Sequence, residues 1–515
     1  MLPCRLGWAK AVRWPVLATN GKPQKRTFNL NPTLIQRQPN ADPTMTNALL
    51  PCILKPTALL ITGFLLLSPA HASGINEPPT DVLLTPGSVG LGVITQIEAS
   101  PYKSAGARFD LQPLYLYEGE RAFLRSGRAG LKLLDTPEHR LDLFVDKRLE
   151  GFQANKIPAS VSGMAMRSSS TDVGLAYSYR QSWGTLQAEW LFDAANTTQG
   201  SEARLGYSYE WRSGPWTLRP AVSLSLRDAK LNNYYYGVLP GEATTTRAAY
   251  APGAGVNASA GLHGTYALTE RWQLLGGVSA TVLSSGIKNS PIVQKRVLPA
   301  IYVGAAYDFG GQNNGQKREA VEASSPTWFK LMYGQATEDG CHLAKIITAR
   351  CLSTASKNAT SIAGLQVGKT LVQALNGWPV DVVGYAGLLH HNDRSLQPNG
   401  AQLDLFVKAF YTGFPWSDRL KTRLGLGAGV SLAQRAPYAE APNASTGPKP
   451  ASRILQSLDP TIDVSLGDLL GYRPLKQTYF GFGVSHRSGV FGSSRLLGNV
   501  NGGSNYIYTY IESAL

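Results

Sequence analysis

Short segments in which apolar residues alternate with small or polar ones recur about eighteen times along this chain, separated by turn residues. Residues 203–211 show the pattern, with Ala, Leu, Tyr, Tyr and Trp at alternate positions and Arg, Gly, Ser and Glu between them. Because successive side chains of a β-strand point to opposite faces, each segment has one apolar, aromatic face and one small or charged face. Closed barrels of such strands satisfy their own backbone hydrogen bonds in lipid. The pattern therefore predicts barrels of a bacterial outer membrane.

An alternative is a pair of soluble β-sandwiches or barrels, since their strands also alternate. A soluble barrel should be apolar inside and polar outside. In this chain, charged residues have the parity opposite to the aromatic ones; they are Arg180, Arg204, Glu210, Arg219 and Arg227. A soluble barrel would then have a charged core, so the sequence favours lipid outside and water inside.

Connection lengths predict the topology of a first barrel over residues 88–310. Ten strands are expected, at 107–116, 121–133, 138–147, 169–181, 184–195, 201–211, 214–226, 255–266, 270–283 and 299–309. The long connections 149–168, 227–254 and 284–298 then fall on one side, as the external loops of outer-membrane barrels do. Residues 90–97 have the same pattern but the wrong parity, so the strand count is ten to twelve.

A polar stretch at 311–326, rich in Gly, Asn, Gln and Ser, is expected to be a linker. A second barrel of eight strands follows over residues 327–515. Its strands are expected at 327–337, 360–372, 380–390, 401–412, 421–434, 459–468, 477–488 and 504–514. The long connections again share one face, and Gly425, Gly427 and Gly429 suit the narrow lumen of an eight-stranded barrel. The fold class is therefore all-β, with two antiparallel transmembrane barrels in tandem.

The beginning of the chain has the pattern of an export signal. From Met45, the basic Lys55, the apolar run 58–67 and the small-x-small site ending at Ala72 predict a signal peptide over 45–72, cleaved near Ala72. The apolar run is too short to span a bilayer as a helix. Residues 1–44 are basic and rich in proline, and are interpreted as an overlong start or a disordered leader. The predicted location is the cell outer membrane.

Net charge adds little once the leader is set aside. The whole chain has a formal charge of +15, and removing residues 1–72 takes away eight of 49 basic and one of 34 acidic residues, which leaves +8. A mild basic excess suits contact with anionic lipid or sugar. The chain has no Lys/Arg-rich run and no nucleic-acid, phosphate-loop, dinucleotide or zinc motif, so we expect no nucleic-acid partner and no cofactor.

Four cysteines are present, and Cys4 and Cys52 lie in the predicted leader. The other two, Cys341 and Cys351, fall in the first external loop expected for the second barrel. In an exported protein they are interpreted as one disulfide that staples this loop, with two free thiols as the alternative.

The first barrel resembles the MipA/OmpV family of outer-membrane proteins. The resemblance rests on six stretches in the family's order: 100–103 (SPYK), 113–118 (PLYLYE), 233–238 (NYYYGV), 250–255 (YAPGAG), 290–293 (SPIV) and 304–309 (GAAYDF). It implies a non-enzymatic barrel with a scaffold or envelope-integrity role, because one family member is regarded as linking a murein-cleaving transglycosylase to a murein synthase. The partners implied are these two enzymes, together with outer-membrane lipid and lipopolysaccharide. Tyr234 to Tyr236 are interpreted as loop-packing aromatics, with a ligand platform as the alternative.

The second barrel is distantly similar to the PagL-type lipid A deacylases, which use a Ser nucleophile and a His base two residues apart. His486 and Ser488 match that spacing. They share the parity of Phe480 and Phe482, so we expect them on the lipid-facing side, beside the acyl chains of lipid A. A Ser activated by a His can attack an ester. The resemblance thus implies a serine esterase as an alternative function.

The third group of the expected catalytic set departs from the family's pattern. No Glu stands at the start of the last strand, and Asp459 is the candidate in its place, with Asn501 or Asn505 as weaker ones. The family's Asn after Ser is replaced by Gly489. A structural His/Ser pair is therefore the competing interpretation, and these departures favour a protein that is not an enzyme.

Two further hypotheses are weaker. His390 and His391 are adjacent at a strand tip and should point to opposite faces, so a shared metal ion is not expected there. A porin is a third functional alternative, and it could pass only small solutes because eight- and ten-stranded lumens are largely filled by side chains.

Overall fold

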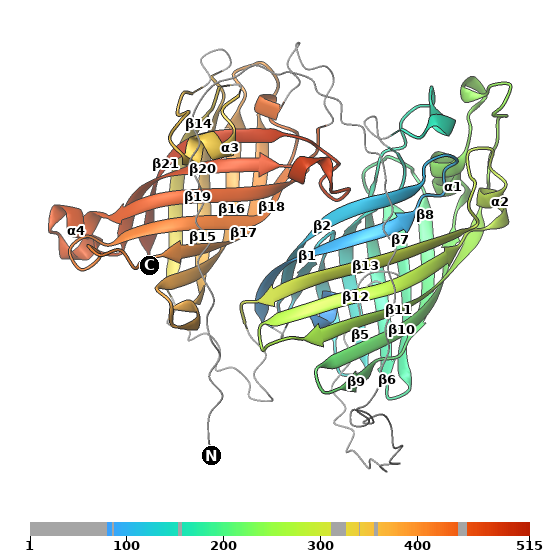
Figure 1. Ribbon diagram of the computed structural model, residues 1–515, viewed down its shortest axis with the longest axis horizontal. Coiled ribbons are helices and arrows are strands. Elements are labelled where there is room, and N and C mark those ends of the chain that lie inside the picture. The colour runs from blue at the N-terminus through green and yellow to red at the C-terminus, as the bar shows by residue number, and fades with distance from the viewer. Residues whose placement is uncertain are drawn as a thin grey trace, which may run out of the picture. The chain divides into compact units, whose positions relative to one another are not determined.

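The computed structural model describes residues 80–84, 87–152, 157–310, 326–338, 340–354, 359–440 and 451–515. The predicted leader and signal peptide, and all but the last residue of the predicted linker, lie outside these residues. The described chain is almost entirely antiparallel β-structure and forms two closed barrels (Figure 1). In the described residues, no helix is long and apolar enough to cross a membrane.

The first barrel is a closed ring of twelve strands, to which the short β9 adds by pairing with β10. Its strands are β1 (Ser88–Ala99), β2 (Ala107–Glu118), β3 (Ala122–Arg125), β4 (Arg128–Asp135), β5 (His139–Lys147), β6 (Thr171–Gln181), β7 (Gly184–Asp193), β8 (Ser201–Ser208), β9 (Trp211–Ser213), β10 (Trp216–Arg227), β11 (Gly255–Ala267), β12 (Trp272–Val282) and β13 (Val297–Asp308). The long connections hold α1 (Ala229–Tyr236) and α2 (Ser285–Lys288). We call the end of the barrel with these connections the external end.

The strand expected at 121–133 is in fact a hairpin. It turns between β3 and β4 at Ser126, whose φ of +57° is a left-handed conformation, and Gly127 follows it. Ser-Gly is a recognised turn dipeptide. The extra strand restores an even count, so residues 90–97 take their place in β1 and the upper limit of the predicted range is confirmed.

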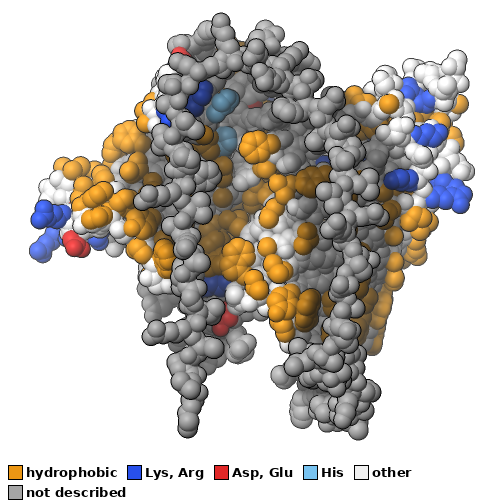
Figure 2. Space-filling view, viewed as in Figure 1, with side chains coloured by type: hydrophobic (Ala, Val, Ile, Leu, Met, Phe, Trp, Pro, Cys, Tyr) orange, Lys and Arg blue, Asp and Glu red, His pale blue; other side chains and the backbone are white. Residues whose placement is uncertain are grey.

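Side-chain exposure follows the predicted parity. Apolar side chains such as Val93, Leu205, Val222 and Val303 are exposed on the outer face of the first barrel. The outer walls of both barrels accordingly show many hydrophobic side chains in the space-filling view (Figure 2). Inside the first barrel, the arginines of the sequence pattern are buried or half-buried among carboxylates; they are Arg180, Arg204, Arg219 and Arg227. The wall is therefore built for lipid outside and polar groups inside.

The second barrel is a closed ring of eight strands, as predicted. Its strands are β14 (Thr327–Ala336), β15 (Ser361–Val372), β16 (Val380–Asn392), β17 (Gly400–Tyr411), β18 (Thr422–Ala433), β19 (Ile454–Ser465), β20 (Thr478–Ser488) and β21 (Gly503–Ala514). The strand expected at 459–468 starts earlier, at Ile454, and gives way to the short helix α4 (Leu466–Leu470). The lumen is narrow: a Cβ added to Gly425 would lie 2.5 Å from Cε of Lys408.

Candidate functional site

The lumen of the first barrel is crossed by a network of ion pairs near its external end. Arg148 lies 2.7 Å from Glu202 and 3.0 Å from Glu150, and Arg227 lies 2.8 Å from Glu150. Burial alone would raise the pKa of Glu150, but Arg227 and Arg148 lower it to about 2. This carboxylate therefore stays charged, and the network is a set of matched charges and not a free cationic patch.

External loops of the first barrel close over the network as one apolar cluster. Its members come from four connections between strands and are Tyr102, Phe152, Val161, Met164, Leu231, Tyr235, Tyr236, Val238, Leu283, Ile287, Ile292 and Val293. The hydroxyl of Tyr102 donates to the backbone oxygen of Tyr235 (3.1 Å), and that of Tyr236 donates to Glu150 (3.2 Å). Asp228 caps α1 by accepting from the backbone N–H of Leu231. These contacts favour the loop-packing interpretation of the tyrosine cluster.

A short segment before β1, residues 80–84, enters the opposite end of the same lumen. Asp81 forms two hydrogen bonds with Arg219 on β10, at 3.0 and 3.1 Å. Leu83 and Leu84 are buried against lumen-facing apolar residues, which are Ile94, Leu114, Leu116, Leu275, Tyr302 and Ala306. This contact was not predicted from the sequence. The signal that points to it is the presence of aliphatic residues at lumen positions of β1 and β2, where the rest of the lumen is charged.

A cavity of about 360 Å³ lies between the loop cluster and residues 80–84. Thr80 and Tyr302 line its lower part, and Tyr236 and Leu283 line its upper part. Its walls carry charges of both signs, including those of Glu98, Arg108, Arg148, Glu150, Glu202 and Arg227. A polar space of this size holds water.

The lumen of the second barrel contains Asp459, which sequence analysis placed beside His486. Asp459 instead accepts a hydrogen bond from Nζ of Lys408 at 2.7 Å and another from the hydroxyl of Tyr508. Its neighbours on β19 alternate between lumen and lipid, and Asp459 has the lumen parity. The expected pairing of Asp459 with His486 is therefore wrong, because the strand directs the two side chains to opposite faces of the wall.

His486 lies on the outer face of β20 and is held by Asn505 of β21, its cross-strand neighbour. The ring donates from Nδ1 to Oδ1 of Asn505 at 2.7 Å, and Nδ2 of Asn505 donates to the backbone oxygen of Cys341 at 3.1 Å. These bonds leave Nε2 as the basic nitrogen of the imidazole. Ser488 accepts a hydrogen bond from the backbone N–H of Val490 at 3.3 Å. In the described residues, no hydrogen bond joins His486 to Ser488.

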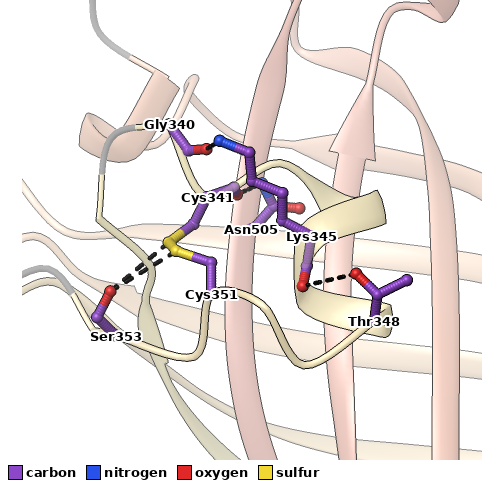
Figure 3. The surroundings of a disulfide bond; sticks show 7 residues. All are labelled: Gly340, Cys341, Lys345, Thr348, Cys351, Ser353 and Asn505. Carbon is purple, nitrogen blue, oxygen red and sulfur yellow. Dashed lines mark hydrogen bonds between the residues drawn. A yellow bond between two sulfur atoms is a disulfide. The ribbon is translucent and has the colours of Figure 1, made fainter. Parts of the chain in front are cut away.

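A disulfide between Cys341 and Cys351 staples the loop that holds Asn505 (Figure 3). The Cα atoms of the two cysteines are 5.6 Å apart. The loop includes α3 (Leu343–Ile347), whose Ile346 packs with Val484 on the outer face of β20. The staple therefore covers the wall next to His486.

His390 and His391 lie just before the last residue of β16, on opposite faces of the wall. His390 is exposed, whereas His391 is buried in the lumen, where its Nε2 lies 2.8 Å from Oε1 of Gln402. The predicted opposite orientation is confirmed, and the two rings do not face a common point.

Comparison with known proteins matches residues 89–309 to the family described as "MltA-interacting protein MipA". Outer membrane protein Omp26La of Vibrio anguillarum is 31% identical over 150 residues, which are 29% of this chain and 58% of that protein. The match therefore spans little more than half the length of that relative. The MltA-interacting protein of Escherichia coli K12 is 24% identical over 225 residues, 43% of this chain and 91% of the relative. Among solved structures, the alignment with a bacterial polysaccharide outer membrane secretin covers 83% of this chain and 99% of the secretin chain. The sequence identity is 9% and the TM-score is 0.20.

Proposed function

Because residues 89–309 form an outer-membrane β-barrel domain of the MipA/OmpV family, we propose that the protein is a scaffold of the murein-processing machinery. The observation that carries this proposal is the match along nearly the whole length of a relative named for its interaction with MltA, a murein lytic transglycosylase. The loop cluster covers the external end of the first barrel, and residues 80–84 pack into its other end. The scaffold proposed here meets its partners through the outer surface of the barrel.

A partner bound to murein must meet the barrel at its periplasmic end, where the connections are short. The turns there expose charged and aromatic side chains, among them Arg121, Glu138 and Trp183. Aromatic and arginine side chains are the ones that most often anchor protein interfaces. We therefore assign the transglycosylase contact to these turns.

The test is retention of purified MltA-type transglycosylase on the immobilised full chain in detergent. We expect retention above background, reduced at least about tenfold in a variant with Arg121→Glu, Glu138→Lys and Trp183→Ala, since interface anchors each contribute more than 1 kcal/mol. A matched variant on external loops, Lys230→Glu with Lys295→Glu, should retain the enzyme like the parent. Retention no higher than on an empty matrix would reject the scaffold.

A second candidate function, hydrolysis of an acyl ester of lipid A, is favoured by the bonds that hold His486. The side chain of Asn505 orients the imidazole from behind, as the third member of a catalytic triad does. In this reaction Ser488 turns from the N–H of Val490 to Nε2 of His486, which takes its proton. The oxygen of Ser488 attacks the ester carbon, the alcohol leaves with that proton, and water then hydrolyses the acyl-enzyme.

Mass spectrometry of lipid A from an expressing host tests this candidate. We expect the parent chain to yield lipid A that has lost an acyl chain, and Ser488→Ala and His486→Ala to yield intact lipid A. Ser485→Ala is the matched control, because Ser485 lies on the same strand and is buried on its lumen side. Equal acyl content in the parent and in all variants would eliminate the esterase.

A further inference from the structure

We propose that residues 80–84 are a removable plug, and that the cavity above them binds a small zwitterionic solute that enters from the periplasm. The solute class is that of amino acids and short peptides. This inference concerns the lumen of the first barrel and is independent of the scaffold function, which concerns its outer turns.

The plug is not part of the sheet that forms the wall. In the described chain, strand pairing of the first barrel begins at Ser88, so residues 80–84 add no strand to the wall. Their contacts with the lumen include the ion pair of Asp81 with Arg219 and the packing of Leu83 and Leu84 on its apolar part. The segment can therefore leave the lumen without breaking a hydrogen bond between strands.

Arg219 does not need the plug in order to stay paired. Its Nη2 also lies 2.5 Å from Glu210, which belongs to the same end of the barrel. When Asp81 leaves, Arg219 keeps its ion pair with Glu210, so release of the plug does not leave an unpaired charge in the lumen. The main cost of release is the exposure of two leucines and of the apolar residues that they cover.

Access from the other end is blocked more firmly. The external cluster joins four loops through twelve buried residues, among them Tyr235 and Ile287 at full burial. The plug has only two apolar residues in its contact. Because buried apolar area sets the cost of opening, the periplasmic end opens first.

Charges in the cavity determine which solute fits. Glu98 pairs with Arg108 at 2.9 Å and with Arg495, another lining residue, at 2.7 Å, whereas Glu150 pairs with Arg227 at 2.8 Å in another part of the wall. Arg108 is the less buried partner, with 23% of its side chain exposed. Because the charges of the wall already balance one another, a solute with one cationic and one anionic group adds no net charge to the buried lumen, whereas a singly charged solute does. The cavity of about 360 Å³ is large enough for a dipeptide.

A single reporter cysteine tests the plug in the full chain. Ser259 lines the cavity on β11, and its hydroxyl lies 2.8 Å from that of Thr281. The Ser259→Cys variant is labelled in detergent with a membrane-impermeant maleimide while the Cys341–Cys351 disulfide is intact. The chain without this substitution gives the background labelling. The opened variant adds Asp81→Asn, Leu83→Ser and Leu84→Ser, which alter no strand, and Leu268→Ser in an exposed turn is the matched control.

We expect slow labelling of the reporter in the parent and in the control, and labelling at least about tenfold faster in the opened variant. The reason is that losing the burial of one leucine shifts the equilibrium between closed and open barrel by more than about tenfold. Heat-modifiable migration on a gel verifies that every variant is folded. Equal labelling rates in the folded parent and the folded opened variant would reject the proposal that residues 80–84 block access to the cavity. Arg219→Gln, which weakens the same contact from the wall side, should accelerate labelling as well.

The solute class is tested by protection of the reporter in the opened variant. We expect glycylglycine to slow the labelling, and sodium acetate and ethylammonium chloride at the same concentration to have little effect. Protection by acetate alone would show that the cavity binds anions, and it would reject the proposal that the cavity binds a zwitterionic solute. An absence of protection by all three would show that the cavity holds water and does not select a solute of this class.

Discussion

Replacing Arg423 with alanine is expected to destabilise the second barrel by about 3–5 kcal/mol, the usual cost of removing one partner from a buried ion pair. The guanidinium of Arg423 lies 2.8 Å from Asp463 and 2.5 Å from Glu512, and its carbon atom lies 3.6 Å from the ring centre of Tyr479. Without the guanidinium, the buried carboxylates of Asp463 and Glu512 lose the cation that pairs with both of them.

Urea titration in detergent, read by tryptophan fluorescence and heat-modifiable migration, measures this loss. Arg419→Ala removes an arginine from an exposed turn of the same barrel and should change the free energy of unfolding by less than about 0.5 kcal/mol. An Arg423→Ala variant as stable as this control would mean that water, and not the protein, solvates the carboxylates of the lumen.

The two barrels, the strand number of the second and the likeness of the first to the MipA/OmpV proteins were all predicted from sequence, because each depends on local pattern. Alternation along a strand determines which face a residue takes, so the outward position of His486 and the inward position of Arg219 follow from parity. The hairpin at Ser126 was missed as a turn because two short strands on either side of it read as one alternating run.

Contacts across the lumen were not predictable in the same way. Asp459 pairs with Lys408 from another strand and with Tyr508 from a third, and parity alone does not tell which lumen residues meet. The plug was missed for a related reason: Leu83 and Leu84 lie before the first strand and outside any alternation. Asn505 was only a weaker candidate, yet its position opposite His486 follows from the register of β20 and β21.

Placing an arginine on the outer wall at Leu331 is expected to cost about 2–4 kcal/mol, the range for Arg or Lys at the lipid-facing midplane of outer-membrane barrels. Leu331 is the fifth of ten residues in β14 and is 67% exposed. Its cross-strand neighbours are Leu365 and Ile511, which continue the apolar band on both sides. At this depth the guanidinium would lie among apolar side chains and lipid, away from the headgroups.

The measurement is the urea midpoint of refolding into vesicles of saturated phospholipid, compared with Leu396→Arg in the external loop between β16 and β17. The loop variant should match the parent, since Leu396 is exposed beyond the strand ends. Repeating the pair in a thinner bilayer should reduce the cost at Leu331, because the arginine then lies closer to the headgroups. Equal midpoints for both arginine variants in every bilayer would mean that the aromatic face meets water, and the charged lumen would then have to be explained without a membrane.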